Sequence, residues 1–328
     1  MKKLFIAIAA VWLCLGFSSL RVVQAADKYP VKPIVFIVPG EAGGDGDVLV
    51  RPVMERVSKI LGQPIVIVNK PGGGATIGYR EIHGAKPDGY TLGWGSATII
   101  TNKLQGVSPL DYHDFTLLGA YATFFPIVIG STKSQVKFNT IQEAIAYAKA
   151  NPGKINMSVA GVGQSWWVAA MAFLGGTNLN MTTIPQPGTG AMVVTAVAGG
   201  HAELGVAALA SAKSMIESGQ VKFLATLGDG RAPAPYDKIP TVRELGYDVS
   251  WESSNFVMGP PKLPKEIVAI LTSAIEKAAK DPEFIKFVGE RNARWEWIPA
   301  EQVVASYDKR RDTVREIMRK AGILKETK

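Results

Sequence analysis

The sequence is poor in the residues that build disulfides and metal centres. One cysteine and three histidines occur among its 328 residues. A single cysteine cannot form a disulfide framework, and it excludes a zinc site with several cysteine ligands. The histidines, His83, His113 and His201, stand singly without the spacing of a metal-binding motif. We therefore expect neither a metal nor another cofactor.

Long apolar runs are absent beyond the N-terminus. Leu4–Phe17 spans 14 residues, fewer than the about 20 that cross a bilayer. Lys2 and Lys3 precede this run, and Val23 and Ala25 occupy the −3 and −1 positions of a cleavage site. The pattern predicts a signal peptide that is cleaved after Ala25. Cys14 lies within it, so the mature chain would contain no cysteine, which suits a periplasmic protein.

Charge of one sign is dispersed along the chain, apart from one C-terminal segment. The chain has 36 Lys and Arg against 28 Asp and Glu, for a net charge of +8. Basic residues gather only over residues 309–320, where their helical spacing is typical of a solvated face. We expect no nucleic-acid partner. The 47% hydrophobic content excludes a disordered chain, and roughly 150 residues per domain predicts two domains.

Short β-branched runs alternate with helical patterns. Residues 34–38 form an apolar run typical of a strand buried on both faces. A helix pattern over residues 50–61 follows, with Asp47 as its predicted N-cap and Gly62 as its C′ residue. Further strands are predicted at 65–68, 90–94, 155–159, 181–184, 202–206 and 222–226, and helices at 141–150, 165–174, 191–198, 210–217, 265–280 and 300–320.

This alternation predicts an α/β fold with mostly parallel sheets covered by helices. Two extended segments, residues 122–129 and 253–258, interrupt it.

Loops rich in glycine, hydroxyl and amide residues follow the predicted strands. In open α/β sheets, ligands bind outside the carboxyl ends of the strands, where helix N-termini favour anions. Any single loop is explained better by turn geometry, but the set favours a site for a carboxylate. The candidate ligand-binding residues are Gly43, Gly44, Asp45, Gly46, Asp47, Ser96, Ala97, Thr98, Gly163, Gln164, Ser165, Gln186, Thr189, Gly190, Ala207 and Ala208.

Enzyme signatures fail when tested individually. A nucleophile elbow at Ser165 would need a glycine where Trp167 stands. Gly72–Gly74 lacks the lysine and hydroxyl of a P-loop, and the segment after Gly161 departs from the dinucleotide fingerprint. The carboxylates of Asp45 and Asp47 could act in acid–base chemistry, but a helix cap and a loop anchor explain them better. We expect a protein that is not an enzyme.

Short motifs containing proline and glycine are spread over nearly the whole predicted mature chain. They are Tyr29–Pro39, Gly43–Asp47, Leu61–Gly72, Gly78, Lys86–Leu92, Asn151–Asn156, Gly188–Ala191, Ile239–Glu244 and Pro260–Pro264. In order and spacing they resemble the receptors of tripartite tricarboxylate transporters, the Bug/TctC-type solute-binding proteins.

The resemblance implies a hinged periplasmic binding protein of type II with two lobes. Residues 26–125 with 252–328 would form the first lobe, and residues 126–251 the second. A monomer would close on a small organic anion and deliver it to a permease with one large and one small membrane subunit.

The resemblance also implies how the ligand is held. In the family, backbone N–H groups, hydroxyls and ordered water hold the carboxylate without an arginine, through positions that match the candidates above. Ala207 and Ala208 depart from the family, since many members have an aspartate where Ala207 stands. An apolar wall, with Trp166 and Trp167 nearby, favours a carboxylate with an apolar or aromatic body. Both tryptophans could equally well pack in the core.

Two other functions stay open on the sequence. A periplasmic hydrolase would lose turnover when Ser165 is replaced, although no histidine lies in a predicted site loop. A sensor would present the same closed lobes to a membrane histidine kinase.

Overall fold

The computed structural model describes residues 29–186, 190–291 and 293–325. Its contacts separate residues 1–31 from a compact unit of residues 32–328. The predicted signal peptide, with Cys14, lies outside the described residues. Among the helices that are described, none is both long and apolar enough to cross a membrane.

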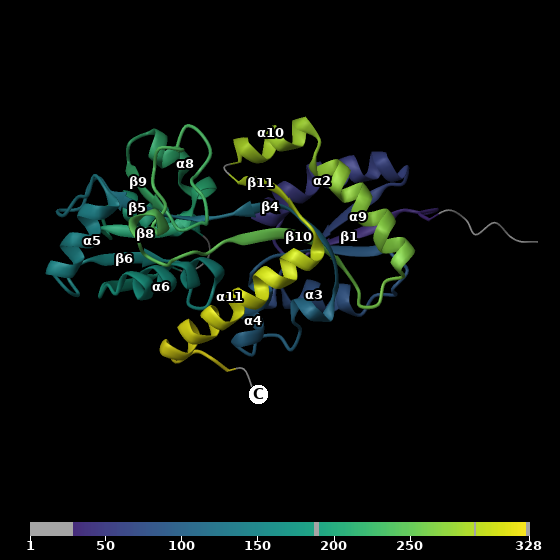
Figure 1. The fold of residues 1–328 in the computed structure, drawn as a ribbon, viewed down its shortest axis with the longest axis horizontal. Helices are drawn as coiled ribbons and strands as arrows, with labels where there is room; N and C mark the ends of the chain where they lie inside the picture. Colours follow the sequence, from purple (N-terminus) through teal and green to yellow (C-terminus); the bar gives the residue numbers. More distant parts are fainter. Residues whose placement is uncertain (1–28, 187–189, 292, 326–328) are drawn as a thin grey trace, which may run out of the picture. The chain divides into compact units, whose positions relative to one another are not determined.

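Two β-sheets form the framework of the compact unit (Figure 1). The six-stranded sheet has the order β11-β4-β10-β3-β1-β2, and the five-stranded sheet has the order β7-β6-β8-β5-β9. The six strands are β1 (Ile34–Val38), β2 (Ile65–Asn69), β3 (Thr91–Gly95), β4 (Thr116–Phe124), β10 (Ser253–Gly259) and β11 (Arg294–Ile298). The five strands are β5 (Pro126–Ser131), β6 (Asn156–Val159), β7 (Thr182–Pro185), β8 (Leu204–Ala208) and β9 (Val221–Thr226). The predicted α/β class is confirmed.

Both sheets are mixed. The pairs β1–β2, β1–β3, β6–β7 and β6–β8 are parallel. Strand β10 runs antiparallel between β3 and β4, and β5 runs antiparallel between β8 and β9. The chain leaves the first sheet through β4, enters the second through β5 and returns through β10. The extended segment predicted at 122–129 is therefore the junction of two strands from different sheets.

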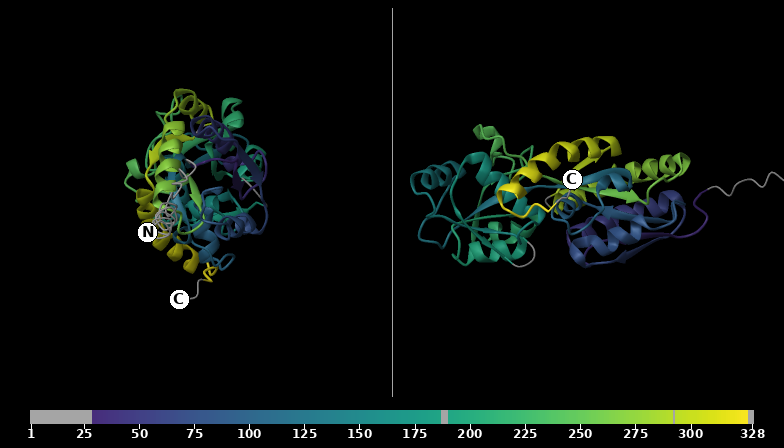
Figure 2. Two further views of the ribbon diagram at one scale, coloured as in Figure 1. Left: turned by 90° about the vertical axis from the view of Figure 1, so that its right-hand side faces the viewer. Right: turned by 90° about the horizontal axis from the view of Figure 1, so that it is seen from below.

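Helices cover the faces of these sheets. They are α2 (Asp45–Leu61), α3 (Thr76–His83), α4 (Thr98–Leu104), α5 (Ile141–Ala150), α6 (Ser165–Thr177), α7 (Gly190–Ala198), α8 (Leu209–Glu217), α9 (Lys265–Ala279), α10 (Pro282–Glu290) and α11 (Ala300–Lys320), with the 3₁₀ turns η1 (Gly73–Ala75), η2 (Tyr112–Asp114) and η3 (Arg243–Leu245). In Figure 1, α2, α9 and α10 lie on one side of the six-stranded sheet, and α3 and α4 on the other. Helix α11 contacts both α4 and α6 (Figure 2).

Helix α6 differs from its predicted end. The sequence predicts that Gly175 and Gly176 close it, but the helix continues to Thr177 and ends at Asn178 in the left-handed conformation. A Cβ on Gly176 would lie 2.4 Å from Val249 Cγ2. The glycine is needed for this close packing and not for a cap.

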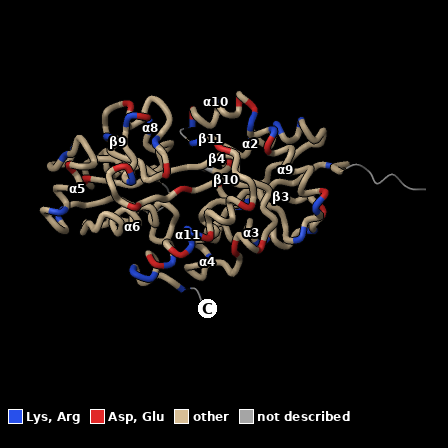
Figure 3. The backbone as a smooth tube through the Cα atoms, in the orientation of Figure 1, with Lys and Arg blue, Asp and Glu red and all other residues tan. Residues whose placement is uncertain are grey.

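The two helices that meet near residue 176 have opposite character. Helix α6 has no charged residue, and Val168 and Phe173 are fully buried. Helix α11 carries charges of both signs along its length (Figure 3) and buries an apolar stripe that includes Val303 and Tyr307. In the chain, helix α10 and strand β11 come between α9 and α11, and the sequence analysis predicts neither of them.

Candidate functional site

A cavity of about 430 Å³ lies where α4 faces the loop between β6 and α6. Its lining residues are Gly74, Thr98, Thr101, Asn102, Gln105, Val107, Val162, Gly163, Gln164, Ser165 and Trp166. None of these has an ionisable side chain, whereas hydroxyl and amide groups are plentiful. We refer to it as the neutral cavity. Of the sixteen candidate residues, it contains Thr98, Gly163, Gln164 and Ser165.

Gly163 brings the two sides of the neutral cavity into contact. Gln105 Nε2 donates a hydrogen bond to the Gly163 carbonyl oxygen at 2.8 Å. Gly163 has φ +81°, and a Cβ there would lie 2.0 Å from Gln105 Oε1. Only glycine fits this approach without strain.

Ser165 is the first residue of α6, and its hydroxyl is hydrogen-bonded to a tryptophan. The indole Nε1–H of Trp251 donates a hydrogen bond to Ser165 Oγ at 3.0 Å. The ladder of α6 begins with Val168 N–H donating to Gln164 O at 3.0 Å. The N–H groups of residues 165–167 precede this bond and have no acceptor within the helix. They lie at the N-terminus of α6, beside the cavity, where the helix dipole favours an anion.

The glycine run before α3 supplies part of the wall that the sequence analysis did not include. Gly72, Gly73, Gly74 and Ala75 all have positive φ. Asn102, which is 5% exposed, donates its Nδ2–H to the Gly74 carbonyl oxygen. The three consecutive glycines are the sequence signal of this wall. In the sequence they are considered only as a P-loop, and they are not included among the candidate residues.

The two adjacent tryptophans take different positions. Trp167 is 4% exposed and packs in the core, while Trp166 is half-buried and lines the neutral cavity. Val107 and Val162, which are 46% and 51% exposed, stand at the same cavity. The cavity thus combines polar donors with an apolar rim.

Asp47 is not the N-cap of α2, because the helix begins two residues earlier and Gly44 is its N-cap, without a side-chain hydrogen bond. Its carboxylate, 3% exposed, instead accepts hydrogen bonds from Gly43 N–H at 2.9 Å and from Arg51 at 2.8 and 2.9 Å. Asn69 Nδ2 donates a further one at 3.0 Å. Burial opposes ionisation, but these hydrogen bonds outweigh it and lower the pKa of Asp47.

The rest of the first candidate loop lies outside the lining of the neutral cavity. Gly43 has φ +79°, which suits its turn, and Gly44 is half-buried. Asp45 opens α2. A Cβ on Gly46 would lie 2.6 Å from the Trp94 ring, so this glycine permits close packing of α2 on β3.

Ser96 and Ala97 precede α4 and are buried. The Ala97 N–H donates a hydrogen bond to Ser253 Oγ at 3.3 Å, which ties this loop to the start of β10.

The remaining candidates lie in the five-stranded half. Gln186 N–H donates to Val159 O at 2.8 Å. Gly190, at the start of α7, lies close to Ala207 and Ala208 at the end of β8: a Cβ on Gly190 would be 3.5 Å from Ala207 Cβ. Neither alanine lines the neutral cavity. Thr189 is outside the described residues.

A larger cavity of about 1260 Å³ lies between α6 and α11. We call it the charged cavity, because its lining includes eight charged residues: Asp229, Arg243, Asp248, Lys309, Arg310, Asp312, Glu316 and Lys320. Both arginines of this lining are tied to carboxylates. Arg243 bonds to Asp229 at 2.8 Å and to Asp248 at 3.1 Å, and Arg310 lies 3.7 Å from Asp229.

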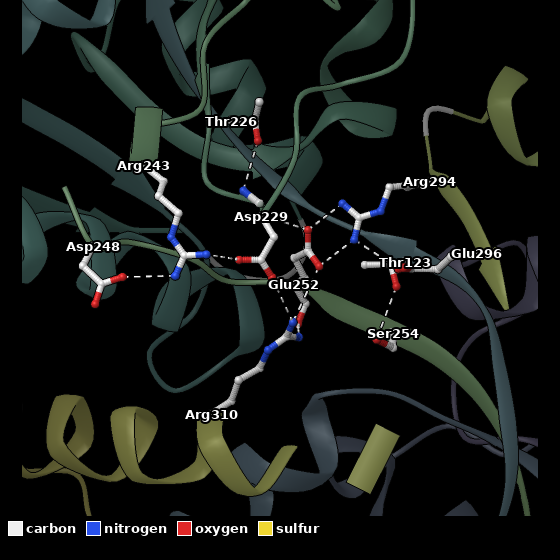
Figure 4. Close-up of polar contacts among 11 residues, drawn as sticks. Thr123, Thr226, Asp229, Arg243, Asp248, Glu252, Ser254, Arg294, Glu296 and Arg310 are labelled. Atoms are coloured by element: carbon white, nitrogen blue, oxygen red, sulfur yellow. Dashed lines mark hydrogen bonds and ion pairs between the residues drawn. The ribbon is translucent and has the colours of Figure 1, made fainter. Parts of the chain in front are cut away.

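Glu252, the residue before β10, anchors this ion-pair network (Figure 4). Its side chain is 4% exposed, and both of its oxygens accept hydrogen bonds from Arg294 at 2.7 Å. Arg310 Nη1 donates to the Glu252 carbonyl oxygen at 2.6 Å. Although burial disfavours the charge, the hydrogen bonds and negative charge of Glu252 raise the pKa of Arg294. The network ties the segment that leads into β10 to strand β11 through Arg294 and to helix α11 through Arg310.

Within the described residues, no group of three histidine, cysteine or acidic side chains could hold a metal ion.

A family model, a curated relative and two solved structures match the chain. The sequence profile of the "Tripartite tricarboxylate transporter family receptor", TctC, matches residues 49–322. A UPF0065 protein of Cupriavidus necator is 31% identical over 290 residues, 86% of each chain. A ligand-free TctC solute binding protein from Polaromonas has a TM-score of 0.79 at 26% identity, covering 89% of this chain and 99% of that one. An R. palustris protein determined with adipate has a TM-score of 0.76 at 24% identity, covering 90% and 99%.

Proposed function

The chain belongs to the TctC family of tripartite tricarboxylate transporter receptors, and on this basis we propose that its neutral cavity binds a small organic carboxylate. TctC proteins are receptors, which agrees with the expectation that the chain is not an enzyme. The hydrolase alternative has no support, since Ser165 is bonded to a tryptophan and not to a general base.

The composition of the cavity wall carries this proposal. Hydroxyls, amide groups and the N-terminus of α6 offer hydrogen-bond donors, and no carboxylate in the lining would repel an anion. The adipate bound to the R. palustris protein supports a carboxylate as the class of ligand. The further candidates Gly43–Asp47, Ser96, Ala97, Gln186, Thr189, Gly190, Ala207 and Ala208 remain proposed parts of the site.

The ligand has an apolar or aromatic body in this proposal. Val107, Val162 and Trp166 give the neutral cavity an apolar rim. Burying a methylene group there contributes about 0.8 kcal/mol.

The mechanism is closure of two lobes, residues 26–125 with 252–328 and residues 126–251. The assignment of strands to the two sheets supports this division. Thr98 comes from the first set of residues and Gly163–Ser165 from the second, so a ligand touching both would favour the closed population. Small-angle scattering should show compaction at saturating ligand, and an unchanged radius of gyration would contradict closure.

The closed monomer would deliver its ligand to a permease of one large and one small membrane subunit. The family match supports this partner, and the predicted signal peptide supports a periplasmic location. A neighbouring permease gene, as opposed to a histidine kinase gene, would favour transport over sensing.

Calorimetry with purified protein tests the ligand class. The panel contains adipate, succinate, benzoate, phenylacetate, adipamide and lysine. We expect one carboxylate bound per chain and no binding of adipamide or lysine. Binding of the neutral or cationic compounds alone would overturn the proposal.

The variant Trp166→Ala tests the apolar body. It should weaken the best apolar carboxylate by about tenfold while changing succinate much less. Ile60→Ala removes an apolar side chain that is 45% exposed on α2 and serves as the control. Equal losses for both ligands would reject the apolar-body part and leave the carboxylate part standing.

A further inference from the structure

The segment before β10 places a tryptophan behind the neutral cavity. Trp251 is 1% exposed, and its backbone N–H donates to Leu227 O at 2.8 Å. Glu252, the next residue, is held by Arg294 through two hydrogen bonds of 2.7 Å. The backbone at residues 251 and 252 is therefore held in place. The indole Nε1–H of Trp251 donates to Ser165 Oγ at 3.0 Å.

This hydrogen bond fixes the role that Ser165 can play. A serine hydroxyl can both donate and accept, whereas an indole N–H only donates. Trp251 therefore occupies one of the two lone pairs of Ser165 Oγ, and the hydroxyl proton and the second lone pair point away from the ring. Ser165 lines the neutral cavity, so its hydroxyl can donate to a ligand there while it accepts from Trp251.

We propose that Trp251 is a positioning residue that holds Ser165 Oγ and strengthens its hydroxyl as a hydrogen-bond donor, so that the cavity favours carboxylate over carboxamide. The inference rests on the proposed function, because it concerns the same cavity. It adds a residue that does not touch the ligand and that controls selectivity through another side chain.

The chemistry explains why a neutral site can prefer an anion. A hydrogen bond to a charged acceptor is stronger than one to a neutral acceptor. A hydroxyl can also accept a hydrogen bond from the NH₂ group of an amide. The hydrogen bond from Trp251 polarises the Ser165 hydroxyl, which makes it a stronger donor and a weaker acceptor, so an NH₂ group placed there is poorly paired.

The experiment measures adipate and adipamic acid binding to the full chain. Adipamic acid differs by one carboxamide, so the ratio of the two dissociation constants reports selectivity. Ser165→Ala should weaken adipate about tenfold. Trp251→Phe keeps the ring but loses the N–H, and should lower the selectivity ratio about threefold to tenfold.

A double variant separates positioning from a structural role. With Ser165→Ala present, Trp251→Phe should lower selectivity no further, because no hydroxyl remains to be held and strengthened. Trp295→Phe is the matched control: its indole Nε1–H donates to Ala279 O at 2.5 Å, and it does not line the neutral cavity. It should leave the ratio unchanged. A Trp251→Phe effect that is equal for both ligands, or additive with Ser165→Ala, would overturn the positioning role.

Two further measurements keep the outcomes distinct. Replacing Trp251 with benzothienylalanine, in which sulfur takes the place of N–H, preserves the shape of the ring if the phenylalanine variant is unstable. The ¹⁵N–¹H indole resonance of Trp251 should shift in Ser165→Ala, and an unshifted peak would overturn the hydrogen bond itself. If the wild-type protein binds no carboxylate, the proposed function fails and the positioning role fails with it. If the wild type binds adipate and the ratio is unchanged in Trp251→Phe, only the positioning role fails.

Discussion

The neutral and charged cavities differ in how they use charge. The charged cavity is about 1260 Å³ and has eight charged residues in its lining, whereas the neutral cavity is about 430 Å³ and has none. At the charged cavity, carboxylates and arginines neutralise each other and tie segments of the chain together. At the neutral cavity, uncharged hydrogen-bond donors line the wall and are available to a ligand. The buried carboxylates and their arginine partners thus serve the framework of the molecule, and removing one of these carboxylates costs stability because its partner loses a counter-charge.

The largest expected effect is on the ion-pair network. Glu252→Gln keeps the shape of the side chain but removes the buried carboxylate from Arg294, which retains only the more exposed Glu296 at 3.1 Å. We expect a loss of about 3 kcal/mol in the free energy of unfolding, measured by urea denaturation. Glu283→Gln is the control, because that side chain is 88% exposed where it pairs with Arg56 and should lose well under about 1 kcal/mol. Equal losses would contradict the framework role of Glu252.

The next effect concerns Asp47, a fixed charge that holds a loop outside both cavities. Asp47→Asn should cost about 2 kcal/mol at neutral pH through weaker hydrogen bonds from Arg51 and Gly43. The pKa of Asp47 is lowered in the folded protein. Its stabilisation is therefore fully present above the ordinary aspartate pKa of about 3.9 and is lost as the pH falls through the lowered pKa.

Urea denaturation at several pH values checks this. The difference between wild type and Asp47→Asn should shrink as the solution becomes more acid. Asp312→Asn, at a side chain 81% exposed, should show only a small and flat difference. A difference for Asp47→Asn that grows toward low pH would show that the sign is wrong.

A smaller effect is expected at the contact across the neutral cavity. Gly163→Ala imposes a left-handed alanine, at about 1 kcal/mol, and pushes against Gln105. Adipate should bind about threefold to tenfold more weakly, as measured by calorimetry. Gly153→Ala has a similar φ of +75° but meets nothing within 4 Å. It should cost similar stability with unchanged affinity, and a loss of affinity in both variants would assign the effect to stability alone.

The smallest expected effect is the response of binding to pH. Because no ionisable side chain lines the neutral cavity, adipate affinity should change less than about twofold between pH 6.5 and 8.5, where both adipate carboxyls are ionised. Calorimetry at four pH values tests this. A steep change centred in that range would place a titrating group at the ligand and remove the contrast between the cavities.

The sequence predicts best those strands and helices whose own residues carry the signal, without help from residues distant in the chain. The β-branched runs of β1 and β2 and the capped helix α5 are local signals of this kind. For α5, the sequence Thr140–Glu143 predicts a capping box, and the structure shows half of it: Thr140 Oγ1 accepts from Glu143 N–H, while the Glu143 carboxylate accepts from Asn139 N–H. The αL residue Gly62 after α2 is also confirmed.

The errors occur where packing decides. Gly176 is inside α6 because Val249 lies against it, and a sequence cannot reveal that neighbour. Asp47 resembles an N-cap in the sequence, yet Arg51 and Asn69 hold its carboxylate. Strand β11 pairs only with β4, far away in the sequence.

The candidate site was predictable in part for a related reason. Thr98 and Gly163–Ser165 follow strands β3 and β6, so the rule for α/β sheets finds them. Asn102 lies one turn inside α4, and Gln105 is the C-cap residue of that helix. Their part in the cavity arises only when α4 meets the β6–α6 loop, and local sequence does not encode that meeting.

The strand order of the six-stranded sheet also sets an order of assembly. Strand β10 occupies the position between β3 and β4, but it is separated from β4 in the chain by all five strands of the other sheet. A chain synthesised only to Thr226 contains the complete five-stranded sheet but only β1, β2, β3 and β4 of the other sheet, and β4 lacks both of its partners. Closing residues 125–252 into a loop then costs entropy before the β4–β10 pairing repays it. We therefore expect completion of the larger sheet to be the late, slow step of folding for this topology.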